Sequence, residues 1–140
     1  AGSAPPVDLA IEKRNAAFVR RLIADGLVNA VHDVSEGGIA CAAVEIALAS
    51  NQGVVLSGEW TAQDLFGEDQ ARYLLSVPPG HVSEVLSRIS TELAPADPAR
   101  RTVGTIRHEA ILGWQGFSPV ALADIRAAYE GWLPNYMKGA

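Results

Sequence analysis

The sequence is 140 residues long, which suits a single domain with one hydrophobic core. Hydrophobic residues make up 49% of it and charged residues 19%, a balance typical of a globular protein and not of a disordered segment. The formal net charge of −5 argues against a general nucleic-acid binder, which needs a dense positive face, so we expect no nucleic-acid partner.

The cysteine content and the ends of the chain bear on compartment. No apolar run approaches the roughly 18 residues that span a bilayer, and no basic segment leads into an apolar one, so we expect neither a membrane partner nor secretion. A lone cysteine, Cys41, fits a reducing compartment and predicts a cytoplasmic location. Residues 1–7 resemble an inter-domain linker or an expression remnant, and the only methionine is Met137. We therefore expect the chain to have been cut from a longer protein.

The first predicted element is an amphipathic helix. Asp8 is expected to cap it, and it runs to about Asp25, where Gly26 stops it. The apolar residues at helical spacing on its expected core face are Ile11, Phe18 and Leu22. A short strand is predicted over residues 28–34.

A second helix is predicted over residues 38–50, after a glycine-containing turn. It is apolar on nearly all sides and carries one charge, Glu45, so we expect it to be buried on more than one side, with a partner for the carboxylate. A strand over 53–56 follows. Thr61 to Asp64 then has the pattern of a capping box for a short helical turn.

The following elements alternate between strand and helix. A strand over 72–77 precedes a clear amphipathic helix. The apolar positions that define this helix are Val82, Val85, Leu86, Ile89 and Leu93. Residues 95–98 are predicted as a loop, and two short strands over 102–106 and 110–113 as a hairpin.

A last helix is predicted to begin at Ser118–Pro119 and to stop at Pro134. Its expected apolar face is made of Leu122, Ile125, Tyr129 and Trp132. Helices and strands alternate without an internal repeat. The predicted fold class is therefore α/β (or α+β), a sandwich with a mixed β-sheet covered by helices.

The first candidate site is the turn between the strand ending near residue 34 and the buried helix. Paired glycines allow close backbone approach, and free amides at a helix N-terminus favour an anion. The carboxylates of Asp33 and Glu36 suit a cation or a phosphate-bound metal. The alternative is a purely structural turn that Ser35 caps. The binding candidates are His32, Asp33, Ser35, Gly37 and Gly38.

The second candidate site is the polar segment before the strand at 72–77. Glu68 and Gln70 are suited to hydrogen-bond an amide or a ribose from a loop. The alternative is a surface turn in which Arg72 pairs with Glu68 or Asp69, worth at most about 1 kcal/mol when exposed. The candidates here are Glu68, Asp69, Gln70 and Arg72.

No other pattern completes an active site. The three histidines show no metal-ligand spacing with each other or with Cys41, which is expected to be a core residue. No nucleophile triad, P-loop or dinucleotide fingerprint is present. The sequence therefore predicts no catalytic residue and no metal ligand.

The two candidate segments together resemble a known superfamily. HDVSEGGIACAAVEIAL at 32–48, LFGEDQARYLLSV at 65–77 and the later VGTI at 103–106 are similar to the C-terminal domain of the aminoimidazole ribonucleotide (AIR) synthase superfamily. The resemblance covers about residues 8–113 and implies an α/β sandwich. In this superfamily such a domain packs beside an N-terminal domain that supplies most of the ATP site. The terminal EGWLPNYM at 130–137 is similar to the phosphoribosylformylglycinamidine (FGAM) synthase family, to the last domain of its small-subunit form.

This resemblance implies an activity, cofactors and partners. The family converts formylglycinamide ribonucleotide to its amidine in purine biosynthesis, using ATP with Mg²⁺ and ammonia from glutamine. The expected partners are the N-terminal domains of the same enzyme, a glutaminase subunit and a small accessory subunit. For this chain, taken as one domain over residues 8–140, the resemblance implies no activity alone and no tightly bound cofactor.

The candidate residues carry over only in part. A Glu-Ser-Gln triplet contacts substrate in the family's first C-type domain, and residues 68–70 stand in the equivalent place with aspartate in the middle. The chain resembles the second copy, from a half considered to lack turnover, so vestigial substrate or phosphate binding is implied. We also expect an exposed apolar face where the N-terminal domain docks.

Two other interpretations stay open: another enzyme of the superfamily, such as AIR synthase or selenophosphate synthetase, and a stand-alone interaction module. Total length separates the enzymes, since more than about 650 residues upstream indicates FGAM synthase and a total near about 340 indicates AIR synthase.

Overall fold

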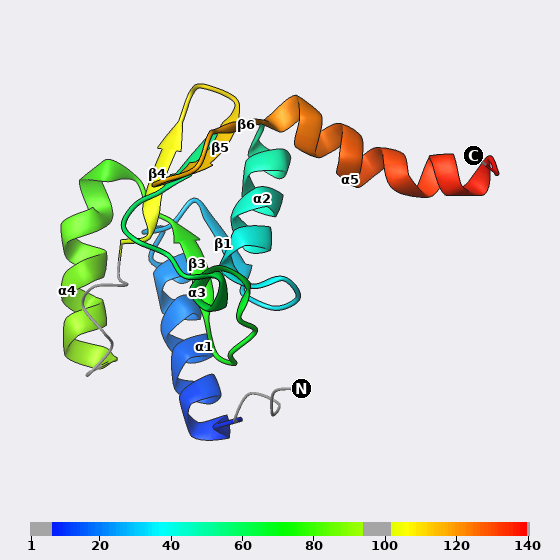
Figure 1. Ribbon diagram of the computed structural model, residues 1–140. Helices are drawn as coiled ribbons and strands as arrows, with labels where there is room; N and C mark the ends of the chain where they lie inside the picture. The colour runs from blue at the N-terminus through cyan, green and yellow to red at the C-terminus, as the bar shows by residue number, and fades with distance from the viewer. Residues whose placement is uncertain (1–6, 94–101, 140) are drawn as a thin grey trace. The chain divides into compact units, whose positions relative to one another are not determined.

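The computed structural model describes residues 7–93 and 102–139 (Figure 1). These residues fall into two compact units. Of the described residues, unit 1 contains 7–43, 60–93 and 102, and unit 2 contains 44–59 and 103–139. The division passes within helix α2, Gly38–Ser50. The loop predicted at 95–98 and most of the linker predicted at 1–7 lie outside the described residues.

Helix α1, Leu9–Ala24, opens unit 1 as predicted. The Asp8 carboxylate accepts hydrogen bonds from the amides of Ala10 and Ile11 at 2.9 and 3.1 Å, which satisfies two donors that the first helical turn leaves free. Gly26 follows the helix with a φ of +69°, the left-handed conformation that commonly ends a helix. The side chains that α1 buries are Phe18, Val19 and Leu22. Ile11 is 39% exposed, so its predicted place on the core face is wrong.

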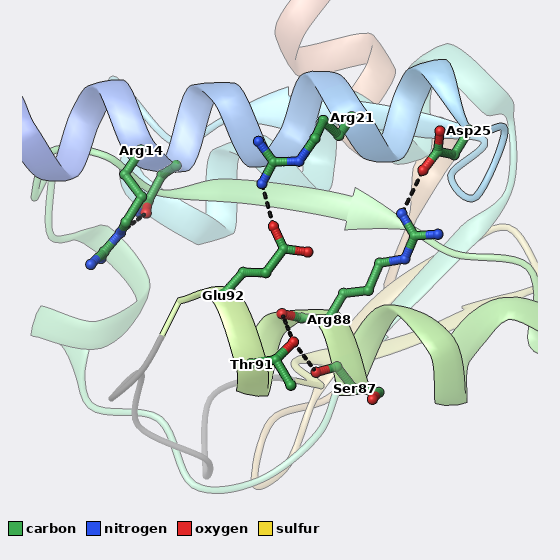
Figure 2. Close-up of polar contacts among 8 residues, drawn as sticks. Arg14, Arg21, Asp25, Ser87, Arg88, Thr91 and Glu92 are labelled. Atoms are coloured by element: carbon green, nitrogen blue, oxygen red, sulfur yellow. Dashed lines mark hydrogen bonds and ion pairs between the residues drawn. The ribbon is translucent and has the colours of Figure 1, made fainter.

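Helix α4, Val82–Glu92, supplies the other side of this core, after a short 3-10 turn, Pro79–His81. The buried cluster of unit 1 consists of Phe18, Leu22, Leu27 and Val85, and Val28, Leu75, Val77, Ile89 and Leu93 pack against it. Polar contacts flank this apolar core (Figure 2). Arg21 pairs with Glu92, and Arg88 pairs with Asp25 of the loop after α1. Hydrogen bonds to Asp25 and Glu84 raise the pKa of Arg88 above its ordinary value.

The strands of unit 1 form a two-stranded antiparallel sheet. β1, Ala30–Asp33, pairs with β3, Tyr73–Ser76, so that Ala30 is opposite Ser76 and Asp33 is opposite Tyr73. Both strands are shorter than predicted. Helix α3, Ala62–Phe66, lies between them in sequence. Its predicted capping box is confirmed: the Thr61 hydroxyl accepts a hydrogen bond from the Asp64 amide, and the Asp64 carboxylate accepts one from the Thr61 amide.

Unit 2 contains a four-stranded mixed sheet in the order β4-β2-β5-β6. β2, Gly53–Leu56, was predicted with these bounds, and it lies between β4, Gly104–Arg107, and β5, Ile111–Trp114. β4 runs antiparallel to β2 and β5 runs parallel to it, so the predicted hairpin of the last two is wrong.

The glycine at the start of β2 allows β4 and β5 to lie on opposite edges of that strand. A Cβ on Gly53 would lie 2.0 Å from the carbonyl oxygen of Glu109 and 2.7 Å from that of Ile111. The chain leaving β4 therefore crosses close over the start of β2 and returns on its other edge. Only glycine leaves room for this crossing.

The helices that precede and follow the strands of unit 2 in sequence, α2 and α5, differ in burial. α2 has the predicted bounds, and its buried side chains point in several directions, as expected: Ala40, Ala42, Ala43, Ala47 and Leu48. α5 spans Leu122–Met137 and follows β6, Val120–Ala121, so the start predicted at Ser118–Pro119 is wrong. Pairing of β6 with β5 holds Val120 and Ala121 in an extended conformation, so the helix begins after them, at Leu122. The stop predicted at Pro134 is also wrong, because that proline lies inside the last turns of α5.

The predicted mixed α/β class is confirmed, with the strands divided between two sheets of which only the larger is mixed. Among the described residues, no helix is both long and apolar enough to cross a membrane.

Candidate functional site

Pairing of β1 with β3 brings the two candidate segments together in unit 1. Asp33 lies opposite Tyr73 at the end of the ladder, and the amide of Val34 donates to the carbonyl of Arg72 at 2.9 Å. The turn that follows β1 therefore begins beside the loop that precedes β3. Two segments about 30 residues apart in sequence form one surface.

The contact that joins them is between Gly37 and Glu68. The backbone amide of Gly37 donates to Oε1 of Glu68 at 2.9 Å, directly before the first residue of α2. An amide at a helix N-terminus favours an anion, and here that anion is a side chain of the same unit. Ser35 was the predicted cap, but its carbonyl closes the turn by accepting from the Gly38 amide at 3.1 Å. The Glu68 carboxylate is the acceptor seen at this helix start.

The two glycines are required by geometry. Gly37 and Gly38 have φ values of +73° and +66°, which L side chains rarely adopt. A Cβ on Gly38 would lie 2.6 and 2.7 Å from the carbonyl oxygens of Leu65 and Gly67. The backbone at the end of α3 thus lies directly against the start of α2, which explains how Glu68 reaches the Gly37 amide.

Arg72 organises the second segment from within. Its guanidinium donates to the carbonyls of Gly67 and Asp69, the latter at 3.2 Å, and lies 3.8 Å from the Asp69 carboxylate. Of the two carboxylates predicted as its partner, Asp69 is the one found. The Arg72 side chain is 25% exposed, so its role in the described structure is to hold the loop.

Two residues of α1 that the sequence did not single out also hold this loop. Glu12 accepts from the amide of Ala71 at 2.9 Å, and Asn15 donates to the carbonyl of Ala71 at 2.9 Å. Both contacts bridge more than 50 residues, so local spacing carries no signal for them. They fix Ala71 at a φ of +62°, a left-handed conformation that costs an alanine about 1–2 kcal/mol.

The remaining candidates lie around this core of contacts. His32 Nδ1 lies 2.6 Å from the carbonyl oxygen of Asp33, a contact with the backbone of the next residue. The side chains of Asp33, Ser35 and Gln70 are exposed. Within residues 7–93 and 102–139, no group of three or more histidine, cysteine or acidic residues could hold a metal ion.

This arrangement sets limits on the chemistry. A phosphate approaching the start of α2 would meet the Glu68 carboxylate at the Gly37 amide, and two anions cannot share one donor without a large electrostatic cost. The described residues therefore do not fit a triphosphate at this turn while Glu68 occupies it.

One family accounts for the sequence. The model of the family described as "AIR synthase related protein, C-terminal domain" matches residues 1–97, more than two thirds of the chain. The chain belongs to this family. The resemblance predicted from segments 32–48 and 65–77 is thereby confirmed.

Curated relatives are similar over the whole chain. Phosphoribosylformylglycinamidine synthase subunit PurL of Methylocella silvestris is 42% identical over 148 residues, which covers 100% of this chain and 19% of the relative. The corresponding protein of Parvibaculum lavamentivorans is 45% identical over 137 residues, covering 95% of the chain and 18% of the relative. The chain thus spans about one fifth of the length of the relatives it matches. Its predicted similarity to FGAM synthase is confirmed.

Solved structures support the fold. Thermotoga maritima PurL complexed with FGAR superimposes with a TM-score of 0.74 at 19% identity, over 88% of this chain and 22% of that one. The same protein complexed with ATP gives 0.67 at 18% identity, over 79% and 21%. The structure of PurLQS from that organism gives 0.73 at 20% identity, over 86% and 22%.

Proposed function

We propose that this chain is the C-terminal AIR synthase-related domain of an FGAM synthase, over residues 8–140. The whole enzyme would form formylglycinamidine ribonucleotide from formylglycinamide ribonucleotide, ATP and an ammonia group from glutamine. The observation that carries the proposal is similarity above 40% to PurL proteins along the full chain. A fold match to a PurL solved with FGAR supports it.

In this proposal the chain completes the enzyme but performs no turnover itself. The support is the contact at the start of α2, where Glu68 occupies the Gly37 amide that a phosphate would need. We propose that the substrate- or phosphate-binding role of residues 32–38 and 68–72 is vestigial in this domain. ATP and Mg²⁺ would bind elsewhere in the whole enzyme. That T. maritima PurL was solved in complex with ATP supports ATP binding by the whole enzyme.

The proposed partners follow from the same similarity. The chain would pack with the other domains of its own polypeptide, and the polypeptide with a glutaminase subunit and a small accessory subunit. The PurLQS structure of T. maritima supports an assembly of this kind. A cytoplasmic location stays a prediction.

Isothermal titration calorimetry tests the vestigial site. The 140-residue chain is titrated with ATP and with ADP, each with Mg²⁺, and beside it the Glu68→Gln variant, which keeps the side-chain shape without the charge. We expect no measurable binding by the unmodified chain, because the carboxylate repels the phosphates. Micromolar affinity of the unmodified chain, lost in the Gly37→Ala variant, would show a working nucleotide site and contradict this part of the proposal.

A further inference from the structure

Helix α5 carries an apolar face that is covered at one end only. Within the first two turns, Leu122 is buried and Arg126 donates to the carbonyl of Leu48 at 2.7 Å. From β6 the helix continues away from the four-stranded sheet of its unit (Figure 1). The same face continues along the remaining turns with five large exposed side chains, here called the α5 stripe: Tyr129, Trp132, Leu133, Tyr136 and Met137.

The spacing of the α5 stripe is that of a helix face made for packing. Its members fall at intervals of three and four residues, so they line one side of α5 in register with Leu122 and Ile125. Trp132 and Tyr136 are 66% and 68% exposed, and their rings stack with centroids 5.5 Å apart. Single exposed apolar residues are common on proteins, but a contiguous aromatic stripe marks a binding surface.

The composition of the helix supports the same conclusion. Gly131 and Pro134 lie inside the exposed turns, and these are the two residues least favourable to a helix interior. Pro134 also removes one backbone donor from the ladder. Helical structure in such a segment depends on packing of its apolar face more than on intrinsic propensity. A partner that covers the α5 stripe would provide that packing.

We propose that the α5 stripe docks onto another domain of the same, longer polypeptide; this rests on the proposed function. The size of the surface favours this occupant over a second copy. The three aromatic rings, each 63–68% exposed, offer roughly 300–500 Å². An independent complex needs about 800 Å² from each partner, whereas contacts between domains of one chain can bury as little as about 600 Å² in total, or about 300 Å² from each side.

The length of the relatives agrees with an occupant in the same chain. The chain covers 18–19% of the PurL proteins it resembles, so about four fifths of such a polypeptide would be available to cover the stripe. Docking within one polypeptide also benefits from a high effective concentration, so that a modest apolar area is enough. The expected docking surface is an apolar groove that accepts the faces of Trp132 and Tyr136.

Hydroxyl-radical footprinting with peptide-resolved mass spectrometry tests the docking. The 140-residue chain and the full-length synthase without its glutaminase subunit are compared at low micromolar concentration. We expect Trp132 and Met137 to react at least tenfold more slowly in the full-length protein. Equal reactivity would overturn the proposal. Protection already present in the 140-residue chain, or appearing only when glutaminase is added, would assign the surface to another occupant and overturn it as well.

A matched pair of variants separates docking from simple loss of helix. Trp132→Ser with Tyr136→Ser removes the stacked pair, whereas Ala127→Ser introduces the same residue at an exposed position on the opposite side of α5. In the full-length synthase, we expect the first variant to speed amide hydrogen exchange in α5 at least tenfold and the second to leave it unchanged. Equal effects of the two would refute docking.

Different results would refute the proposed docking and the proposed function. Formation of FGAM by a full-length protein whose Trp132 stays reactive would refute docking alone. Protection of Trp132 in a full-length protein that makes no FGAM would refute the function alone.

Discussion

The close contact between the start of α2 and the end of α3 predicts a large loss of stability for Gly38→Ala. A left-handed backbone costs an L-residue about 1–2 kcal/mol, and Gly38 has a φ of +66°. The added methyl would also lie 2.6 Å from the Leu65 carbonyl oxygen and 2.9 Å from the carbonyl carbon of Phe66. These are backbone atoms that cannot rotate away, so overpacking adds about 1–3 kcal/mol. We expect a total loss of about 2–5 kcal/mol in the free energy of unfolding.

Gly26→Ala is the matched control. Gly26 has nearly the same φ, +69°, but nothing lies within 4 Å of its Cβ position, so the variant carries the backbone cost alone, about 1–2 kcal/mol. Urea unfolding of both variants, followed by circular dichroism, gives the difference directly. A loss at Gly38 no larger than at Gly26 would refute the close approach, and with it the geometry that brings Glu68 to the Gly37 amide.

Three further predictions concern the stability of unit 1, measured as free energies of urea unfolding. Leu22→Ala empties a fully buried position and should cost about 2–5 kcal/mol, whereas Ile23→Ala, at a 52% exposed neighbour, should cost less than about 1 kcal/mol; similar losses would contradict the observed core. Ala71→Gly removes left-handed strain and should stabilise by up to about 1 kcal/mol, and a loss of stability would argue against it. Arg88→Met removes two exposed ion pairs and should cost at most about 1 kcal/mol, less in 1 M salt; a larger, salt-independent loss would contradict this.

Features set by neighbouring residues could be read from the sequence. The Asp8 cap, the Thr61–Asp64 capping box and the bounds of α2 and β2 each depend on residues within one helical turn or on an uninterrupted pattern. Residues this close in sequence come into contact at a small cost in chain entropy, so the sequence pattern and the structure agree.

Features set by distant residues could not be read in this way. β4 and β5 lie on either side of β2 because a close crossing at Gly53 was possible, and nothing in their own sequences shows this. Helix α5 begins later than the Ser118–Pro119 pattern predicts, because the pairing of β6 with β5 outweighs this local preference. Tertiary contacts override local preference in both cases.

The candidate site shows the same division. Each of its two segments was recognised by composition, but the bond from Gly37 to Glu68 joins residues 31 apart. The hydrogen bonds of Glu12 and Asn15 to the backbone of Ala71 join residues more than 50 positions apart, so no local sequence pattern predicts them. Pairing of β1 with β3 creates the site, so its geometry follows from the fold alone.

FGAM formation by the full-length polypeptide, with and without Glu68→Ala, tests the proposed function. The assay supplies formylglycinamide ribonucleotide, ATP, Mg²⁺ and ammonium. We predict that the unmodified enzyme forms FGAM and that the variant retains kcat/KM within about twofold, as expected if the role of Glu68 is vestigial, which is what we propose. Absence of FGAM formation by the unmodified enzyme, or a loss of more than about tenfold in the variant, equivalent to about 1.4 kcal/mol of transition-state stabilisation, would contradict the account.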